Sequence, residues 1–136
     1  MREILFRGKP KNLKAYGWVY GQLLYHSEEM SKIYSDEIDS PVGVIPDTVG
    51  QFTGLTDKNG KKIFEGDIVR ILGNQDVDDW KNVDYAALIA FIDGGFCAID
   101  GTVEEHAFRR YALSRLDFSL EVIGNIYDNP ELLEED

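Results

Sequence analysis

Short apolar runs, separated by polar stretches that contain glycine, make up most of this chain. EILFR at 3–7, YGWVYGQLLY at 16–25, VGVI at 42–45 and DIVRIL at 67–72 have strand length and favour aromatic or β-branched residues. SLEVIGNIYD at 119–128 has the same character. The pattern predicts a mainly β protein.

Tight turns are marked between several of these runs. Asn59-Gly60 stands between FTGLT and KKIF, and both turn residues tolerate the positive φ that a two-residue hairpin requires. Glu65-Gly66-Asp67 indicates a second reversal. We expect a further hairpin across YAALIAFIDGGFCAID at 85–100, with Gly94-Gly95 at its turn.

Two segments depart from the strand pattern. HSEEMSKIYSDEIDS at 26–40 is polar, so we expect a surface excursion with at most a short strand at SKIYS; binding sites often lie on such excursions. Apolar residues recur at helical spacing near 103–114, which predicts a short helix. Pro130 can begin a second short helix in ELLEE.

The turn DKNGKK does not fit a cation-binding or phosphate-binding loop. An EF-hand loop that began at Asp57 would have Lys61 and Lys62 at its fifth and sixth positions, where an oxygen ligand and a glycine are needed. The phosphate-loop pattern GxxxxGK[ST] is missing from the sequence. We therefore interpret this turn as a hairpin that shapes the fold.

Composition and charge limit the number of domains, the cellular location and the class of partner that we expect. The chain has 136 residues, which fits one domain, and its single cysteine, Cys97, excludes an intrachain disulfide and favours the cytoplasm. No apolar run is long enough for a signal peptide or a membrane span. The net charge of −11 argues against non-specific binding of nucleic acid. A sharper alternative is that the acids imitate a nucleic-acid backbone for a basic partner.

Candidate catalytic groups are few and scattered. A nucleophile would need a neighbouring base, and Cys97 with His106 is only a weak pair. Cys97 is better interpreted as a small buried hydrophobe. Together with His26 these residues lack any zinc-ligand spacing. We expect no enzymatic activity, no metal and no cofactor.

Aromatic residues point to protein contacts instead. Trp80 lies in an acidic polar loop, and with Asp78 and Asp79 it is the best candidate for a binding site on a protein partner. Trp18 and Tyr20 give one strand an aromatic face. Core packing is the simpler interpretation of that face, and a partner or self-association surface is the alternative.

Nucleic-acid binding is the alternative function. Lys58, Lys61, Lys62 and Arg70 gather around the predicted hairpin, and small β-barrels occur in such roles, although the composition makes this partner unlikely. A homo-oligomer is also plausible, because free strand edges invite pairing.

Three segments of the chain together resemble YopX-like proteins, a functionally uncharacterised family encoded by bacterial phages and prophages. They are MREILFR, QFTGLTDKNGKKIFEGDIV and EVIGNIYDNPELLEE; residues 73–118 match no pattern of the family. The resemblance implies a mainly β fold with a small SH3-like barrel, and no catalytic residues.

From the resemblance and the residues together we expect one YopX-like domain over 1–136. Its barrel core would span approximately 42–128 and its acidic tail 129–136. The expected function is that of a non-enzymatic phage accessory protein. It would bind a host or phage protein, of basic character, in the cytoplasm of a bacterial cell.

Overall fold

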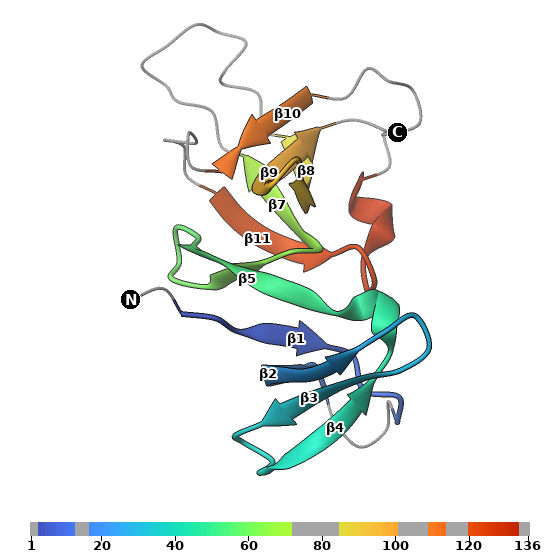
Figure 1. Ribbon diagram of the computed structural model, residues 1–136. Coiled ribbons are helices and arrows are strands. Elements are labelled where there is room, and N and C mark those ends of the chain that lie inside the picture. Colours follow the sequence, from blue (N-terminus) through green and yellow to red (C-terminus); the bar gives the residue numbers. More distant parts are fainter. Residues whose placement is uncertain (1–2, 13–16, 72–84, 101–108, 114–119, 134–136) are drawn as a thin grey trace, which may run out of the picture. The chain divides into compact units, whose positions relative to one another are not determined.

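The structure, a computed structural model, describes residues 3–12, 17–71, 85–100, 109–113 and 120–133. Antiparallel strands dominate these ranges, which confirms the prediction of a mainly β fold (Figure 1). The chain divides into two compact units, residues 1–54 and 55–136. Within the described part of the chain, no helix has the length and apolar character needed to cross a membrane.

Unit 1 contains an antiparallel sheet with the strand order β4-β3-β2-β1-β5 (Figure 1). Its strands are β1 (Phe6–Gly8), β2 (Val19–His26), β3 (Ser31–Ser35), β4 (Ser40–Val44) and β5 (Gly50–Thr56). A 3-10 turn, η1 (Pro46–Thr48), follows β4 and begins at a proline. The last residues of β5 continue past Gly54 into unit 2.

One face of this sheet forms the core of unit 1. Val19, Ile33 and Val44 are almost completely buried there, and partly buried apolar side chains pack against them. These are Phe6, Leu23, Val42 and Val49. Because side chains alternate between the two faces of a strand, the neighbours of the core residues point to the opposite face.

The segment at 26–40, expected to be a surface excursion, contains one strand between two turns. The possible strand at SKIYS is confirmed as β3, which pairs with β2 on one side and with β4 on the other. Burial alternates strictly along it, because Ser31, Ile33 and Ser35 are buried and the two residues between them point outward. Two of these inward residues are serines, so the strand has no apolar alternation that its sequence could reveal.

Hydrogen bonds explain why serine is tolerated at these buried positions. The Ser31 hydroxyl lies 2.6 Å from His26 Nδ1, and the Ser35 hydroxyl accepts a hydrogen bond of 3.2 Å from the backbone N–H of Ile38. A buried hydroxyl without such a partner would destabilise the sheet. Polar inward residues therefore hold the two turns of β2–β3–β4 in place.

Unit 2 contains a second antiparallel sheet, with the order β10-β9-β8-β7-β11. Its strands are β7 (Asp67–Ile71), β8 (Tyr85–Ile92), β9 (Gly95–Asp100), β10 (Arg109–Ala112) and β11 (Leu120–Asn125). The short strand β6 (Lys62–Phe64) pairs with β5, and a 3-10 helix, η5 (Pro130–Leu133), lies near the C-terminus. The predicted helix at ELLEE is thus present in 3-10 form.

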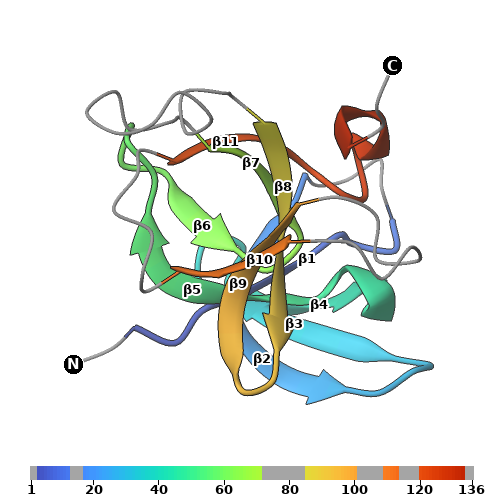
Figure 2. The same cartoon turned by 90° about the horizontal axis from the view of Figure 1, so that it is seen from above.

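The β8–β9 hairpin was predicted, with its turn one residue too late (Figure 2). Asp93 and Gly94 have positive φ angles of 53° and 82°, whereas Gly95 already pairs with Ile92. Two positive φ angles are what a tight hairpin turn requires. Asp-Gly therefore forms the turn in place of the predicted Gly-Gly.

The core of unit 2 is larger than that of unit 1. Its buried members are Ile63, Val69, Ile71, Ala87, Ile89, Ala98, Leu113 and Leu120. Cys97 is buried as well, which confirms the prediction that it packs as a small hydrophobe.

Some predictions for this half of the chain fail or stay open. The prediction of a helix near 103–114 is wrong for Arg109–Ala112, because these residues form strand β10 and pair with β9. Residues 103–108 lie outside the described ranges. Backbone pairing with a neighbouring strand overrides local helical spacing there. The strand order does not confirm a closed SH3-like barrel, since β10 and β11 are its outer strands. The single domain, its core at 42–128 and its tail at 129–136 stay predictions.

Candidate functional site

The first predicted site lies outside the described residues. Trp80, Asp78 and Asp79 fall within 72–84, so their role as partner contacts stays a prediction. His106, the weak candidate base, also lies outside the described ranges.

The four basic residues predicted as nucleic-acid contacts are all exposed, and two of them lie beside one carboxylate. Lys58 Nζ is 3.1 Å from Glu121 Oε2. Arg70 is directly opposite Glu121 in the pairing of β7 with β11. Lys61 and Lys62 belong to the turn and to the start of β6. Glu121 therefore weakens the attraction that this group would have for phosphates.

Asp57 explains the most patterned stretch of the sequence. Its Oδ1 accepts hydrogen bonds from the backbone N–H groups of Asn59 and Lys61, at 2.8 and 2.9 Å, and its Oδ2 accepts one from Val122 at 2.9 Å. The side chain is only 7% exposed. One carboxylate thus shapes the predicted Asn-Gly turn and fastens it to β11, which we call the Asp57 clasp.

The electrostatics of the clasp favour the ionised carboxylate. Burial raises the pKa of Asp57, but the N–H donors of Val122, Lys61 and Asn59 and the charge of Lys61 lower it, and the net result lies below the ordinary value of 3.8. At neutral pH the carboxylate is therefore charged and accepts all three hydrogen bonds. Both carboxylate oxygens are therefore engaged in hydrogen bonds within the protein.

The turn at Gly66 and the chain around Gly124 are also held by contacts within the fold. Gly66 donates its N–H to the carbonyl of Ile89 at 2.8 Å and accepts the N–H of Ile126 at 2.9 Å. The buried Asp67 accepts the N–H of Phe64 at 2.7 Å. A Cβ added at Gly124 in β11 would lie 2.6 Å from Asn129 Oδ1 and 2.9 Å from Leu132 Cδ1, so these side chains pack directly against the glycine. The middle and C-terminal segments quoted above thus fasten one another within unit 2.

An exposed aromatic surface lies on unit 1, on the face opposite its core. Gln22 pairs directly with Tyr34, and Tyr25 with Lys32, so each pair points to the same side of the sheet. Tyr20 is two residues before Gln22 and shares that side. We call these five residues the tyrosine face.

A β-bulge places Tyr25 on the tyrosine face. The pairing register of β2 with β3 shifts between Leu23 and Tyr25, and this leaves Leu24 as the extra residue. Without the bulge, Tyr25 would follow Leu23 onto the core face. Tyr20 and Tyr25 are instead 44% and 51% exposed, which contradicts core packing as the role of the aromatic side of β2.

Two cations lie against Trp18, next to the start of β2. The Arg7 guanidinium carbon is 4.6 Å from the centre of the Trp18 ring, and Lys9 Nζ is 6.0 Å from it. Contacts of this length are cation–π interactions. Arg7 is also paired with Tyr20 across β1 and β2, so Trp18 packs beside one border of the tyrosine face.

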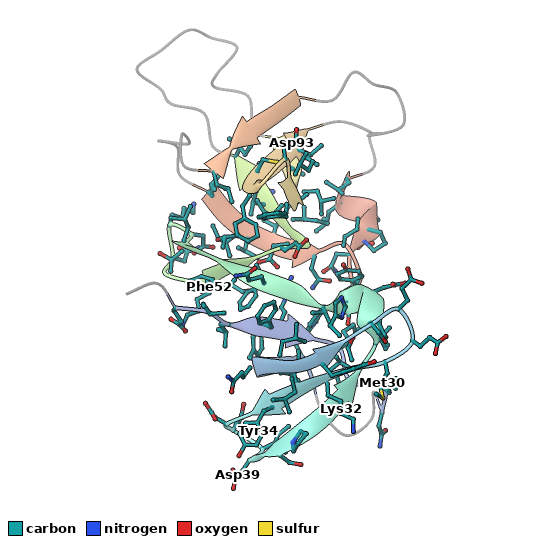
Figure 3. All side chains as sticks on the ribbon, in the orientation of Figure 1. Met30, Lys32, Tyr34, Asp39, Phe52 and Asp93 are labelled. Carbon is teal, nitrogen blue, oxygen red and sulfur yellow. The ribbon has the colours of Figure 1, made fainter. Side chains whose placement is uncertain are left out.

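A carboxylate meets the opposite border of the face. The Tyr34 hydroxyl donates a hydrogen bond to Asp39 Oδ1, and both side chains lie at one end of the β3–β4 hairpin (Figure 3). Hydrogen bonding to Asp39, burial and the charge of Asp36 together raise the pKa of Tyr34 above 10.0. The negative charge of the turn after β3 therefore acts directly on Tyr34 in the tyrosine face.

Sequence reasoning missed the tyrosine face as a unit. Tyr20 was considered, but Tyr25 and Tyr34 come from segments whose register only pairing and the bulge define. The described residues contain no group of three or more His, Cys, Asp or Glu side chains placed to hold a metal ion. The exposed aromatic sheet face is the best candidate functional site that the structure describes.

The molecule is thus defined as a mainly β protein with two antiparallel sheets, patterned turns that stabilise one of them, and exposed aromatic side chains on the other. The chain belongs to the YopX family, because the family model described as YopX protein matches residues 5–134. This confirms the resemblance inferred from its three segments.

Two solved structures are similar over almost the whole chain. The crystal structure of protein EF1440 from Enterococcus faecalis has 25% sequence identity and a TM-score of 0.59, and the alignment covers 98% of this chain and 100% of that one. The crystal structure of protein yopX from Bacillus subtilis has 20% identity and a TM-score of 0.54, with the same coverage. The comparison with curated proteins found no match.

Proposed function

We propose that this protein is a non-enzymatic accessory protein that binds another protein through the tyrosine face. The observation that carries the proposal is the exposure of Tyr20 and Tyr25 on the tyrosine face, next to the exposed bulge residue Leu24. Tyrosine is enriched at interface hot spots, because it offers a large contact area together with a hydrogen-bonding group. Contiguous exposed apolar side chains of this kind typically mark interaction sites.

The proposal of a non-enzymatic role is supported by the positions of the reactive groups. Asp57 and Asp67 are buried carboxylates, and both accept hydrogen bonds from backbone N–H groups of neighbouring turns. Cys97 is buried within β9. These side chains therefore lie where they stabilise the fold, and exposed aromatic residues are the better candidates for function.

The origin of the protein, its location in the cell and the character of its partner are also proposals. As the family resemblance implies, the protein would be encoded by a phage or prophage and act in the cytoplasm of the bacterial host. Its partner would be a basic protein, given the net charge of −11. The strands around the core of unit 2 would belong to a small SH3-like barrel, and homo-oligomerisation would be compatible with the outer strands of its sheet.

Site-specific photo-crosslinking tests the proposal. A photoreactive phenylalanine analogue would replace Tyr20 or Tyr25 in the full chain, and Phe91 would serve as the control position because it is 53% exposed but lies in unit 2. We expect a discrete protein adduct, on irradiation of the producing cells, from the two tyrosine positions and not from Phe91. Mass spectrometry of the adduct identifies the partner.

Substitution of the face supplies the second measurement. Tyr20→Thr and Tyr25→Thr place a β-branched residue, which favours strand, at each position, so the fold should be preserved. Loss of a hot-spot aromatic residue should weaken partner binding by roughly tenfold or more. Adducts that contain only nucleic acid would overturn protein binding in favour of the alternative function, and adducts only from Phe91 would contradict the site.

A further inference from the structure

We infer that the tyrosine face receives an extended, arginine-bearing segment of the partner protein. This inference rests on the proposed function and specifies which chemistry the surface recognises. Its basis is the distribution of carboxylates around the face, described in the following paragraphs.

Charge is divided unevenly within unit 1. Residues 1–19 carry five basic and one acidic side chain, a formal charge of +4, whereas residues 20–44 carry one basic and five acidic side chains, a formal charge of −4. The second range contains β2, β3 and β4. The segment 20–44, which carries the tyrosine face, is therefore acidic through its turns, although unit 1 as a whole is nearly neutral.

The five acids lie in the two turns that border β3. Glu28 and Glu29 are exposed in the turn between β2 and β3, which we call the first acidic turn. Asp36, Glu37 and Asp39 are exposed in the turn between β3 and β4, the second acidic turn. The hydrogen bond from Tyr34 to Asp39 connects the second acidic turn directly to the face. Aromatic rings thus lie between two groups of carboxylates.

Arginine matches this arrangement better than lysine does. A guanidinium group stacks on a tyrosine ring and also forms paired hydrogen bonds with a carboxylate. Lysine provides a strongly hydrated point charge that does neither as well. Lys32 is exposed between the acidic turns and is outnumbered by the acids, whereas Arg7, opposite Tyr20, is buried. A partner segment with phosphates would meet repulsion at both turns.

The length of β3 sets the spacing of the arginines. Its five residues, Ser31–Ser35, extend for roughly 15 Å at about 3.3 Å per residue. An extended peptide that crosses the face along β3 would therefore reach both acidic turns with arginines about five residues apart. Two adjacent arginines could reach only one turn.

Titration of the full-length protein with designed peptides tests the inference. The probe is a short glycine–serine peptide with two arginines about five residues apart. Comparison probes have adjacent arginines, spaced lysines or spaced glutamates, and oligothymidine of similar length represents nucleic acid. NMR chemical shifts of the backbone amides report affinity and location. We expect the spaced-arginine peptide to bind most tightly and to shift signals of β2, β3 and both acidic turns.

A pair of charge variants separates the local site from the overall charge. Asp36→Asn/Glu37→Gln removes two of the three carboxylates of the second acidic turn and keeps the Asp39 contact of Tyr34. Asp47→Asn/Glu131→Gln removes the same amount of charge from exposed positions outside β2–β4. The first variant should weaken binding by about threefold or more, since a carboxylate–guanidinium contact is lost, and the control by less than about 1.5-fold.

Each other outcome overturns the inference. Equal weakening by both variants would mean attraction to the net charge alone. Equal affinity for the spaced and adjacent peptides would contradict the geometry across β3. Preference for oligothymidine would indicate a nucleic-acid platform. If crosslinking from Tyr20 identifies a protein partner while the peptides and the charge variants have no effect, the proposed function stands and the arginine specificity fails.

Discussion

Replacing Asp57 by alanine is expected to lower the free energy of unfolding by roughly 3 kcal/mol, because three backbone N–H groups lose a charged acceptor. Two of these groups, from Asn59 and Lys61, shape the turn before β6, and the third, from Val122, belongs to β11. The loss is a large fraction of the stability of a typical domain, which is about 5–15 kcal/mol. Urea denaturation at neutral pH measures it.

Asparagine at the same position should have a smaller effect. Its side-chain oxygen can still accept from Asn59 and Lys61, but its NH2 group would face the N–H of Val122. Lys58→Ala is the matched control, because it removes the neighbouring Lys58–Glu121 ion pair, which is partly exposed. It should cost less than about 1 kcal/mol. A loss for Asp57→Ala as small as that of the control would contradict the clasp.

The stability of the wild-type protein should also depend on the ionisation of Asp57. Its pKa is lower in the folded chain than the ordinary value of 3.8, so the ionised clasp contributes fully above that value. The contribution is lost as the pH falls from about 4 through the folded pKa, because the unfolded chain then binds the proton more tightly. The stability difference between wild type and Asp57→Ala should therefore narrow below about pH 4 and stay constant near pH 7. A difference that stays constant down to pH 2 would show that folding does not lower the pKa of Asp57.

Local signals in the sequence were sufficient wherever one short segment determines its own conformation. Asn59-Gly60 predicted the hairpin turn, and Gly60 indeed has a φ of 83°. The reversal at Glu65-Gly66-Asp67 was equally readable, and Gly66 has a φ of 92°. What the sequence did not reveal was why an aspartate precedes the first turn, because the partner of Asp57 in β11 is 65 residues further along the chain.

Properties that depend on pairing between strands could not be predicted. β3 has serines at two of its inward positions, so a search for alternating apolar residues does not detect its burial pattern. The tyrosine face requires the bulge at Leu24, and a shift of one residue would send Tyr25 to the core side. Arg109–Ala112 has helical spacing around it, yet it pairs with β9. Each of these is decided by a neighbouring strand.

Replacing Gly21 by alanine is expected to have the largest effect on unit 1. A Cβ at this position would lie 1.8 Å from the carbonyl oxygen of Tyr34 and 2.8 Å from its carbonyl carbon. Both contacts are with the backbone of β3, so no side-chain rotation can relieve them, and β2 and β3 must separate. We expect a loss of at least about 3 kcal/mol in the free energy of unfolding.

Gly43→Ala provides the matched control for this substitution. Gly43 lies on β4 of the same sheet, and a Cβ added there would meet nothing within 4 Å. Its stability should stay within about 0.5 kcal/mol of the wild type. Because the tyrosine face depends on the register of β2 with β3, Gly21→Ala should also abolish the amide shifts caused by the spaced-arginine peptide, and Gly43→Ala should retain them. Equal urea midpoints for the two variants would mean that β2 and β3 do not approach as closely as the structure shows.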